Sequence, residues 1–427
     1  MKRHLKRLDD EQKTVAKNYS ALMILQGLNY VLPFVIIPFL ERTLELERFG
    51  LVMLAQYLMA LCIAATDFGF STTAVREISV LKSKREDYST IYFKVFWARA
   101  ILLVLVFAAL CVFVFTIPRF AKEWEVYLLS YGMVVGQTML GDWFFQGIER
   151  MRILTAVNAV SKILFTLLLF LFISSPSDYI LVPIFNSIGY LFAGVIMFGL
   201  SFRYVSWQWP NFRNTNGFYR DSFQIFISDL SSQFTYAANG VVLGLFAGDS
   251  VVGIFSAFDK LILAARKMYI PISQAFYPYL SRKPYQEKRS MMKKLALGTL
   301  TIGTIGMLIL VFFGSFILNI LYADPAIAAN DYLLKWMGIS VLFVGLSLLF
   351  TNLYAPARKL FHQRLKILTS ATVFNLILGF LLVPKLGLTG TIVTTIFTEL
   401  LMVIIAAYYY WGDASSNSEE NQQLNKR

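Results

Sequence analysis

The chain has 427 residues, of which 57% are hydrophobic and only 15% are charged. Soluble domains are nearer about 45–50% apolar, so we expect a polytopic membrane protein embedded in a lipid bilayer. The net charge of +13 does not by itself indicate nucleic-acid binding, because membrane proteins concentrate Lys and Arg in their cytoplasmic loops. We expect no nucleic-acid partner.

Cysteine and histidine are too sparse for a disulfide framework or a metal site. Cys62 and Cys111 fall within apolar stretches, and His4 and His362 stand alone in basic segments. The chain also lacks a P-loop, a dinucleotide-binding glycine pattern and the HExxH and GxSxG motifs. We therefore expect no cofactor and no metal, and a protein without a catalytic motif that is not an enzyme.

Apolar stretches long enough to span a bilayer recur along the whole chain. The first follows a charged segment, is too long for the apolar part of a signal peptide and has no cleavage pattern after it, so we expect it to be retained. The sequence predicts an all-α protein with about twelve spans, at 19–40, 50–72, 95–117, 126–148, 153–173, 179–201, 223–246, 250–277, 295–321, 333–354, 367–383 and 388–411.

Lys and Arg are divided unevenly between the two sets of loops. With the N-terminus inside, 28 of the 39 basic residues lie in cytoplasmic segments and six lie in outside loops. This bias predicts an N-in, C-in topology. The five remaining cations lie within predicted spans and are Arg99, Lys162, Lys260, Arg266 and Lys267.

A polar connection containing Trp207 and Trp209 separates six spans from six. A faint repeat supports this division, because Gly50 and Gly253 each reopen an apolar run after an outside turn. Parallel repeats of this kind predict two helix bundles with the substrate of a transporter between them. We predict an N-terminal cytoplasmic segment at 1–18, a six-helix lobe at 19–201, a cytoplasmic linker at 202–222, a second six-helix lobe at 223–411 and a disordered cytoplasmic tail at 412–427.

The predicted span at 250–277 carries the densest group of charges. Lys260 lies roughly 15 Å and Arg266 roughly 24 Å from its start, so we expect both near mid-depth in a hydrocarbon core of about 30 Å. Such a charge either faces a polar cavity or is neutralised by a neighbour that fixes packing. Asp259 and Arg266 share a helical face at i, i+7, so both interpretations remain open.

The other intramembrane charges allow similar alternatives. Lys162 lies roughly 15 Å beyond Arg152, whereas Arg99 is close enough to the cytoplasmic surface to snorkel. Glu399, near the middle of the last span, is a candidate proton or cation site or a partner for a cation of the C-terminal lobe. The carboxylates within the spans, as candidates for ion coupling or charge pairing, are Asp67, Asp142, Asp229, Asp259 and Glu399.

Three stretches resemble the bacterial polysaccharide flippases of the Wzx type. They are Leu44-ELERFGLV, Asp67-FGFSTTAVREIS and Gly141-DWFFQGIERMR. The resemblance is strongest over residues 15–160. It implies the V-shaped fold of the multidrug/oligosaccharidyl-lipid/polysaccharide exporter superfamily, a bacterial inner-membrane location, and translocation of undecaprenyl-diphosphate-linked O-antigen units through a cationic lumen.

The family implies alternating access, with H⁺ or Na⁺ as a possible coupling ion and a polysaccharide polymerase and chain-length regulator as possible partners. The five acids within the spans depart from a purely cationic lumen. A cation-coupled multidrug antiporter of the same superfamily is one alternative, although organic cations would favour an acidic cavity. A lipid II-type flippase is another, but that family usually has two more spans.

Overall fold

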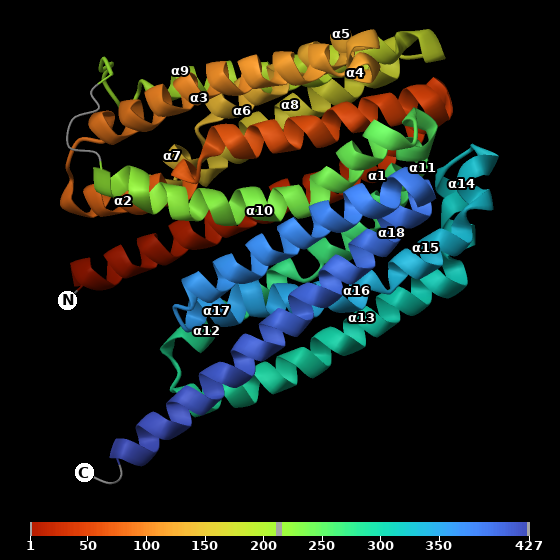
Figure 1. Cartoon of the computed structure of the whole chain (residues 1–427). Helices are drawn as coiled ribbons and strands as arrows, with labels where there is room; N and C mark the ends of the chain where they lie inside the picture. Colours follow the sequence, from red (N-terminus) through yellow and green to blue (C-terminus); the bar gives the residue numbers. More distant parts are fainter. Residues whose placement is uncertain (1, 211–215, 425–427) are drawn as a thin grey trace. The chain divides into compact units, whose positions relative to one another are not determined.

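Helices form nearly all of the computed structural model, which describes residues 2–210 and 216–424 and contains no strand in that part (Figure 1). Seven helical stretches of the described chain are long and apolar enough to cross a membrane. The predicted all-α membrane fold is therefore confirmed, and the chain is a multi-pass membrane protein.

The seven stretches contain nine of the twelve predicted spans. Two of them each cover a pair, because α1 and α18 run through sharp kinks at Glu45 and Gly387. The other three predicted spans lie in short consecutive helices at 126–148, in the polar helix at 223–246 and in the charged segment at 250–277. The count of twelve and the orientation stay predictions.

The chain divides into two compact units, Met1–Leu230 and Ser231–Arg427. The division falls within α10, Asn216–Phe246, after the connection predicted as a linker, of which residues 211–215 lie outside the described part. The helices before α10 are α1 (Lys2–Asp67), α2 (Phe70–Lys84), α3 (Ser89–Thr116), α4 (Pro118–Lys122), α5 (Trp124–Ser130), α6 (Gly132–Leu140), α7 (Asp142–Gly147), α8 (Met151–Phe172), the 3-10 helix η1 (Pro176–Ile180) and α9 (Leu181–Ser201).

The helices of the second unit follow α10. They are α11 (Asp249–Lys267), α12 (Ile270–Arg282), α13 (Tyr285–Leu321), α14 (Pro325–Ala329), α15 (Asp331–Gly338), α16 (Ser340–Leu348), the π-helix η2 (Leu349–Tyr354), α17 (Ala355–Ala357) and α18 (Phe361–Leu424). The backbone of α18 thus continues helically through most of the predicted disordered tail, whose last three residues lie outside the described part.

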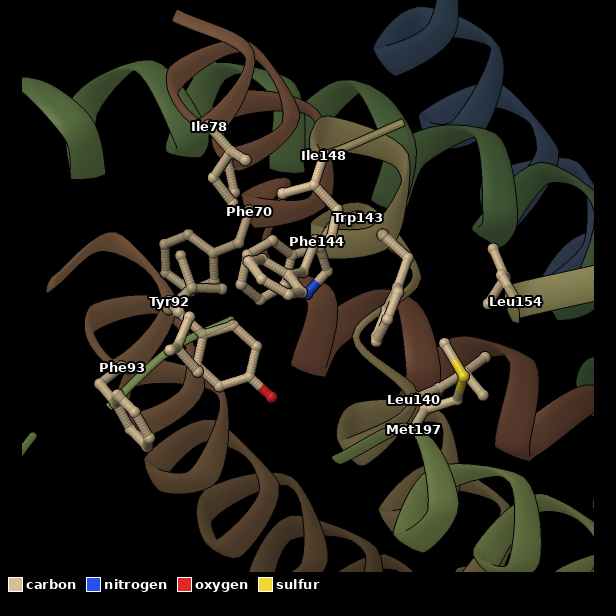
Figure 2. Close-up of a cluster of buried hydrophobic side chains, with 14 of the residues drawn as sticks. Phe70, Ile78, Tyr92, Phe93, Leu140, Trp143, Phe144, Ile148, Leu154 and Met197 are labelled. Atoms are coloured by element: carbon tan, nitrogen blue, oxygen red, sulfur yellow. The ribbon is translucent and has the colours of Figure 1, made fainter. Parts of the chain in front are cut away.

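An aromatic core holds the first unit together where α2, α3 and α7 meet. Phe70, Tyr92, Trp143 and Phe144 are all buried in it (Figure 2). Tyr92 and Phe144 meet edge to face with ring centroids 4.9 Å apart, a favoured aromatic geometry. Two of the three family-like stretches therefore meet in this core, which fixes the ends of α1 and α6 relative to one another.

α6 and α9 lie side by side and approach closely because glycine faces glycine (Figure 1). A Cβ atom added to Gly194 on α9 would lie 2.5 Å from the carbonyl oxygen of Gly136 on α6. A Cβ on Gly136 would in turn clash with the backbone of Tyr190. Small residues let membrane helices pack at this distance.

The ends of α1 and α11 have the same pattern. α1 ends at Asp67 and α2 begins at Phe70, while α11 ends at Lys267 and α12 begins at Ile270. The prediction of one continuous helix over 250–277 was therefore wrong. In the first unit the break needs glycine, because Gly69 has φ +69° and its Cβ would lie 2.5 Å from the carbonyl oxygen of Ser222.

Two helix ends, one in each unit, have the same hydrogen-bond pattern although their sequences differ. Glu149, after α7, and Lys359, after α17, have φ values of 61° and 59°. Each donates its N–H to the carbonyl three residues earlier, at 3.0 Å, and the next residue donates to the carbonyl five residues earlier. This is the Schellman motif, and it ends the segments predicted as spans four and ten.

Candidate functional site

The best-defined polar site of the second unit is an ion pair between α11 and α18. Arg266 NH2 donates to Glu399 Oε1 at 3.0 Å, and the two side chains are 12% and 2% exposed. Because both charges are desolvated, each depends on the other for neutralisation. Of the two roles open to Glu399 in the sequence, the structure shows pairing with a cation of the C-terminal half.

Two further elements hold this pair in place. The guanidinium carbon of Arg266 lies 3.5 Å from the ring centroid of Tyr236 on α10, a close cation–π contact. Ser347, at the end of α16, donates to Glu399 Oε2 at 3.2 Å. The buried Nε of Arg266 has no hydrogen-bond partner among the described residues. The guanidinium therefore keeps one donor that an incoming acceptor can use.

Arg266 lies as far along its helix as the sequence predicts, but the helix ends one residue after it. Since α11 ends at Lys267, Arg266 lies in its last turn, about 26 Å from the Asp249 end. Lys260 lies only about 16 Å from that end. Lys260 thus lies near the middle of α11, whereas Arg266 and Lys267 lie at its C-terminal end; the depth of these charges in a bilayer stays a prediction.

Three further charges on α11, Asp259, Lys260 and Lys267, interact electrostatically. Asp259 and Lys260 attract each other, and Lys260 and Lys267, one heptad apart, are close enough to repel. All three side chains are half-buried. Together with Arg266 they give α11 three cations, its carboxylates are Asp259 and, in the first turn, Asp249, and Glu399 of α18 supplies a third negative charge.

A second ion pair lies in the first unit. Arg99 on α3, only 2% exposed, donates from NH2 to Asp67 Oδ1 at 2.7 Å, and the Ser71 hydroxyl donates to the same oxygen at 2.5 Å. Asp142 on α7 is close enough to interact electrostatically with both charges, and one of its carboxylate oxygens accepts from the Trp143 N–H at 2.9 Å. Arg99 therefore pairs within the protein and does not snorkel.

The structure assigns neither Lys162 nor Asp229 to the two ion pairs. Lys162 is half-buried on α8, and Asp229 is half-buried on α10. Sequence reasoning missed Tyr236 and Ser347. Tyr236 falls in a stretch already notable for its polar residues, whereas nothing distinguishes Ser347 from other small residues of an apolar run.

The chain is similar to known proteins in sequence. A family model described as "Polysaccharide biosynthesis protein" matches residues 15–283. A protein of Shigella dysenteriae, described as "Putative O-antigen transporter", is 26% identical over 390 residues, which cover 90% of this chain and 97% of that protein.

Two solved structures share the fold at low identity. The MATE multidrug transporter DinF-BH gives a TM-score of 0.64 at 16% identity, covering 94% of this chain and 95% of that chain. The lipid II flippase MurJ, in an inward closed conformation, gives 0.61 at 15% identity, covering 89% and 87%. The fold is therefore MATE-like.

Proposed function

Because this chain belongs to the family of polysaccharide biosynthesis proteins, we propose that it is a flippase for lipid-linked polysaccharide units. Its substrate is an undecaprenyl-diphosphate-linked O-antigen or related repeat unit, moved by alternating access from the cytoplasmic to the periplasmic leaflet of a bacterial inner membrane. The description of the Shigella relative and the fold shared with a lipid flippase and a drug transporter support this proposal.

The observation that carries the proposal is the set of cations on α11. A diphosphate cannot enter hydrocarbon without replacing its hydration, and charge-assisted hydrogen bonds from Arg and Lys are the strongest replacement. Arg266 and Lys267 lie near the end at which the substrate arrives, and Lys260 lies about 9 Å deeper than Arg266. The polyprenyl tail stays in lipid while the head group passes along these cations.

The Arg266–Glu399 pair defines the substrate-free state of the site. Without substrate, Glu399 neutralises Arg266 at 3.0 Å and Tyr236 holds the guanidinium in place. An arriving diphosphate first uses the unpartnered Nε and then displaces the carboxylate. Glu399, 2% exposed, then needs a proton or a monovalent cation. Substrate and coupling ion are thus linked by competition for one arginine.

Complementation tests the proposal. A strain lacking its own flippase would express the wild type, Arg266→Gln, Lys260→Gln or Lys293→Gln at matched levels, and surface polysaccharide would be scored by gel. Lys293 is an exposed lysine on α13, so Lys293→Gln controls for loss of one positive charge. We expect the wild type and the control to restore long chains, and both α11 variants to reduce them at least about tenfold.

The results distinguish an error in the proposed function from an error in the proposed site. Failure of the wild type, together with a gain in drug tolerance, would replace the flippase with an antiporter. Full activity of Arg266→Gln and Lys260→Gln would retain the flippase but assign these charges a structural role.

A further inference from the structure

A second group of cations lies in the second unit, away from α11, where α13 begins and α17 ends. Arg358 donates from Nε and NH2 to the two carboxylate oxygens of Asp413, at 3.0 and 2.9 Å, and Tyr354 donates to Asp413 at 2.5 Å. The Arg358 guanidinium carbon also lies 4.6 Å from the ring centroid of Tyr285. The bidentate pairing and the ring contact hold the Arg358 guanidinium in one position.

The first turns of α13 add two cations close to Arg358. Lys288, only 8% exposed, donates from Nζ to the carbonyl oxygen of Ala357 at 3.1 Å, which ties α13 to α17. The guanidinium carbon of Arg289 lies 5.5 Å from the ring centroid of Tyr410, whose hydroxyl donates to the Arg289 carbonyl at 3.3 Å. Backbone and ring contacts therefore fix where both charges lie.

The group has an excess of positive charge. Lys288 interacts electrostatically with Arg358, Lys359 and Asp413, and Arg289 also interacts with Asp413. Four cations thus share one carboxylate among the residues whose side chains are described. The nearby Glu287 does not compensate them, because it pairs with Lys283 at 2.8 Å. A partly buried cationic group of this kind is stabilised by an added anion.

Two buried donors in the group have no acceptor. The hydroxyl of Tyr285 and the Nε of Arg289 are both inaccessible to solvent and lack a hydrogen-bond partner in the described part of the chain. Buried polar groups are almost always hydrogen-bonded in native proteins. Both atoms are donors beside an excess of cations, so one anionic acceptor would satisfy the donors and offset the charge.

The depth of the group selects the kind of anion. α13 has 37 residues and is about 55 Å long, which exceeds the bilayer thickness of about 40–45 Å including head groups. Its apolar part begins near Leu295, so Lys288 and Arg289 lie about 10 Å outside it along the helix, near the head-group layer. We propose that Tyr285, Lys288, Arg289 and Arg358 bind the phosphate group of an anionic lipid.

Binding to the purified full chain in non-ionic detergent tests the site. The probes are phosphatidylglycerol, a polyprenyl diphosphate, inorganic pyrophosphate and phosphatidylcholine, followed by native mass spectrometry. We expect the two anionic lipids to bind, with Kd raised roughly tenfold by Arg289→Gln and unchanged by Lys293→Gln on the same helix. Tyr285→Phe, which removes one oxygen and leaves every charge, should raise Kd about threefold.

The four probes distinguish the possible sources of the phosphate. Preference for the diphosphate identifies the site with the transported substrate, and equal binding of phosphatidylglycerol identifies a phospholipid site. Binding of pyrophosphate alone, equal binding of phosphatidylcholine, or equal loss in Arg289→Gln and Lys293→Gln would each overturn the proposal. No arm measures transport, so the site and the flippase function can fail independently.

Discussion

Removing one member of the Arg266–Glu399 pair should destabilise the second unit more than removing both. Breaking a buried pair leaves an uncompensated charge and costs about 3–5 kcal/mol. Because Glu399 is 2% exposed but Arg266 retains 12% exposure and its contact with Tyr236, we expect about 3 kcal/mol for Arg266→Gln or Glu399→Gln. For a unit of this size that lowers Tm by roughly 6–12 °C.

The double variant Arg266→Gln/Glu399→Gln removes both charges and should lose less than about 2 kcal/mol, giving a coupling energy of at least about 4 kcal/mol. Thermal unfolding in detergent, followed by circular dichroism, measures all four forms, and Lys293→Gln should match the wild type. A double variant as unstable as the two single losses combined would show that the charges do not stabilise each other, and the proposed competition at Arg266 would lose its basis.

Two further comparisons test the packing and the charges of the first unit. Gly194→Ala places a methyl group 2.5 Å from the Gly136 carbonyl oxygen and should lower the free energy of unfolding by about 2 kcal/mol or more. Gly199→Ala on the same helix meets nothing within 4 Å and should be neutral or slightly stabilising. Equal Tm values for the two variants would contradict the close helix contact. Arg99→Gln should cost about 3 kcal/mol in chemical unfolding because Arg99 is 2% exposed. Arg48→Gln breaks a pair with Glu123 in which the two side chains are 36% and 20% exposed, and it should cost less than about 1 kcal/mol. The reverse order of the two losses would be incompatible with the burial described.

The long apolar helices of this protein could be predicted because membrane thickness imposes a length on apolar segments. Not every break could be. The sequence predicts a break between the stretches at 19–40 and 50–72, and two helices do meet there at the kink at Glu45. Conversely, the apolar run at 250–277 is continuous in sequence but breaks after Lys267.

The sequence offered the charged residues as candidates and Glu399 as a partner for some cation of the C-terminal lobe, but it did not show which cation. Helical spacing suggested Asp259 for Arg266, whereas the partner is Glu399, 133 residues later. Arg99 finds Asp67 across 32 residues. Such pairs depend on which helices are neighbours, and hydropathy carries no information about neighbours. Local periodicity thus identifies costly charges without showing what neutralises them.

The length of α13 distinguishes the two halves of the predicted repeat from each other. α3 and α13 form the corresponding third and ninth predicted spans, yet α13 has 37 residues and α3 has 28. The nine additional residues amount to about two and a half helical turns. If the two helices are matched at their C-terminal ends, those turns are the ones that carry Lys288 and Arg289, and α3 has no equivalent of them. Any lipid held at the start of α13 therefore acts on one half of the repeat and has no counterpart on the other.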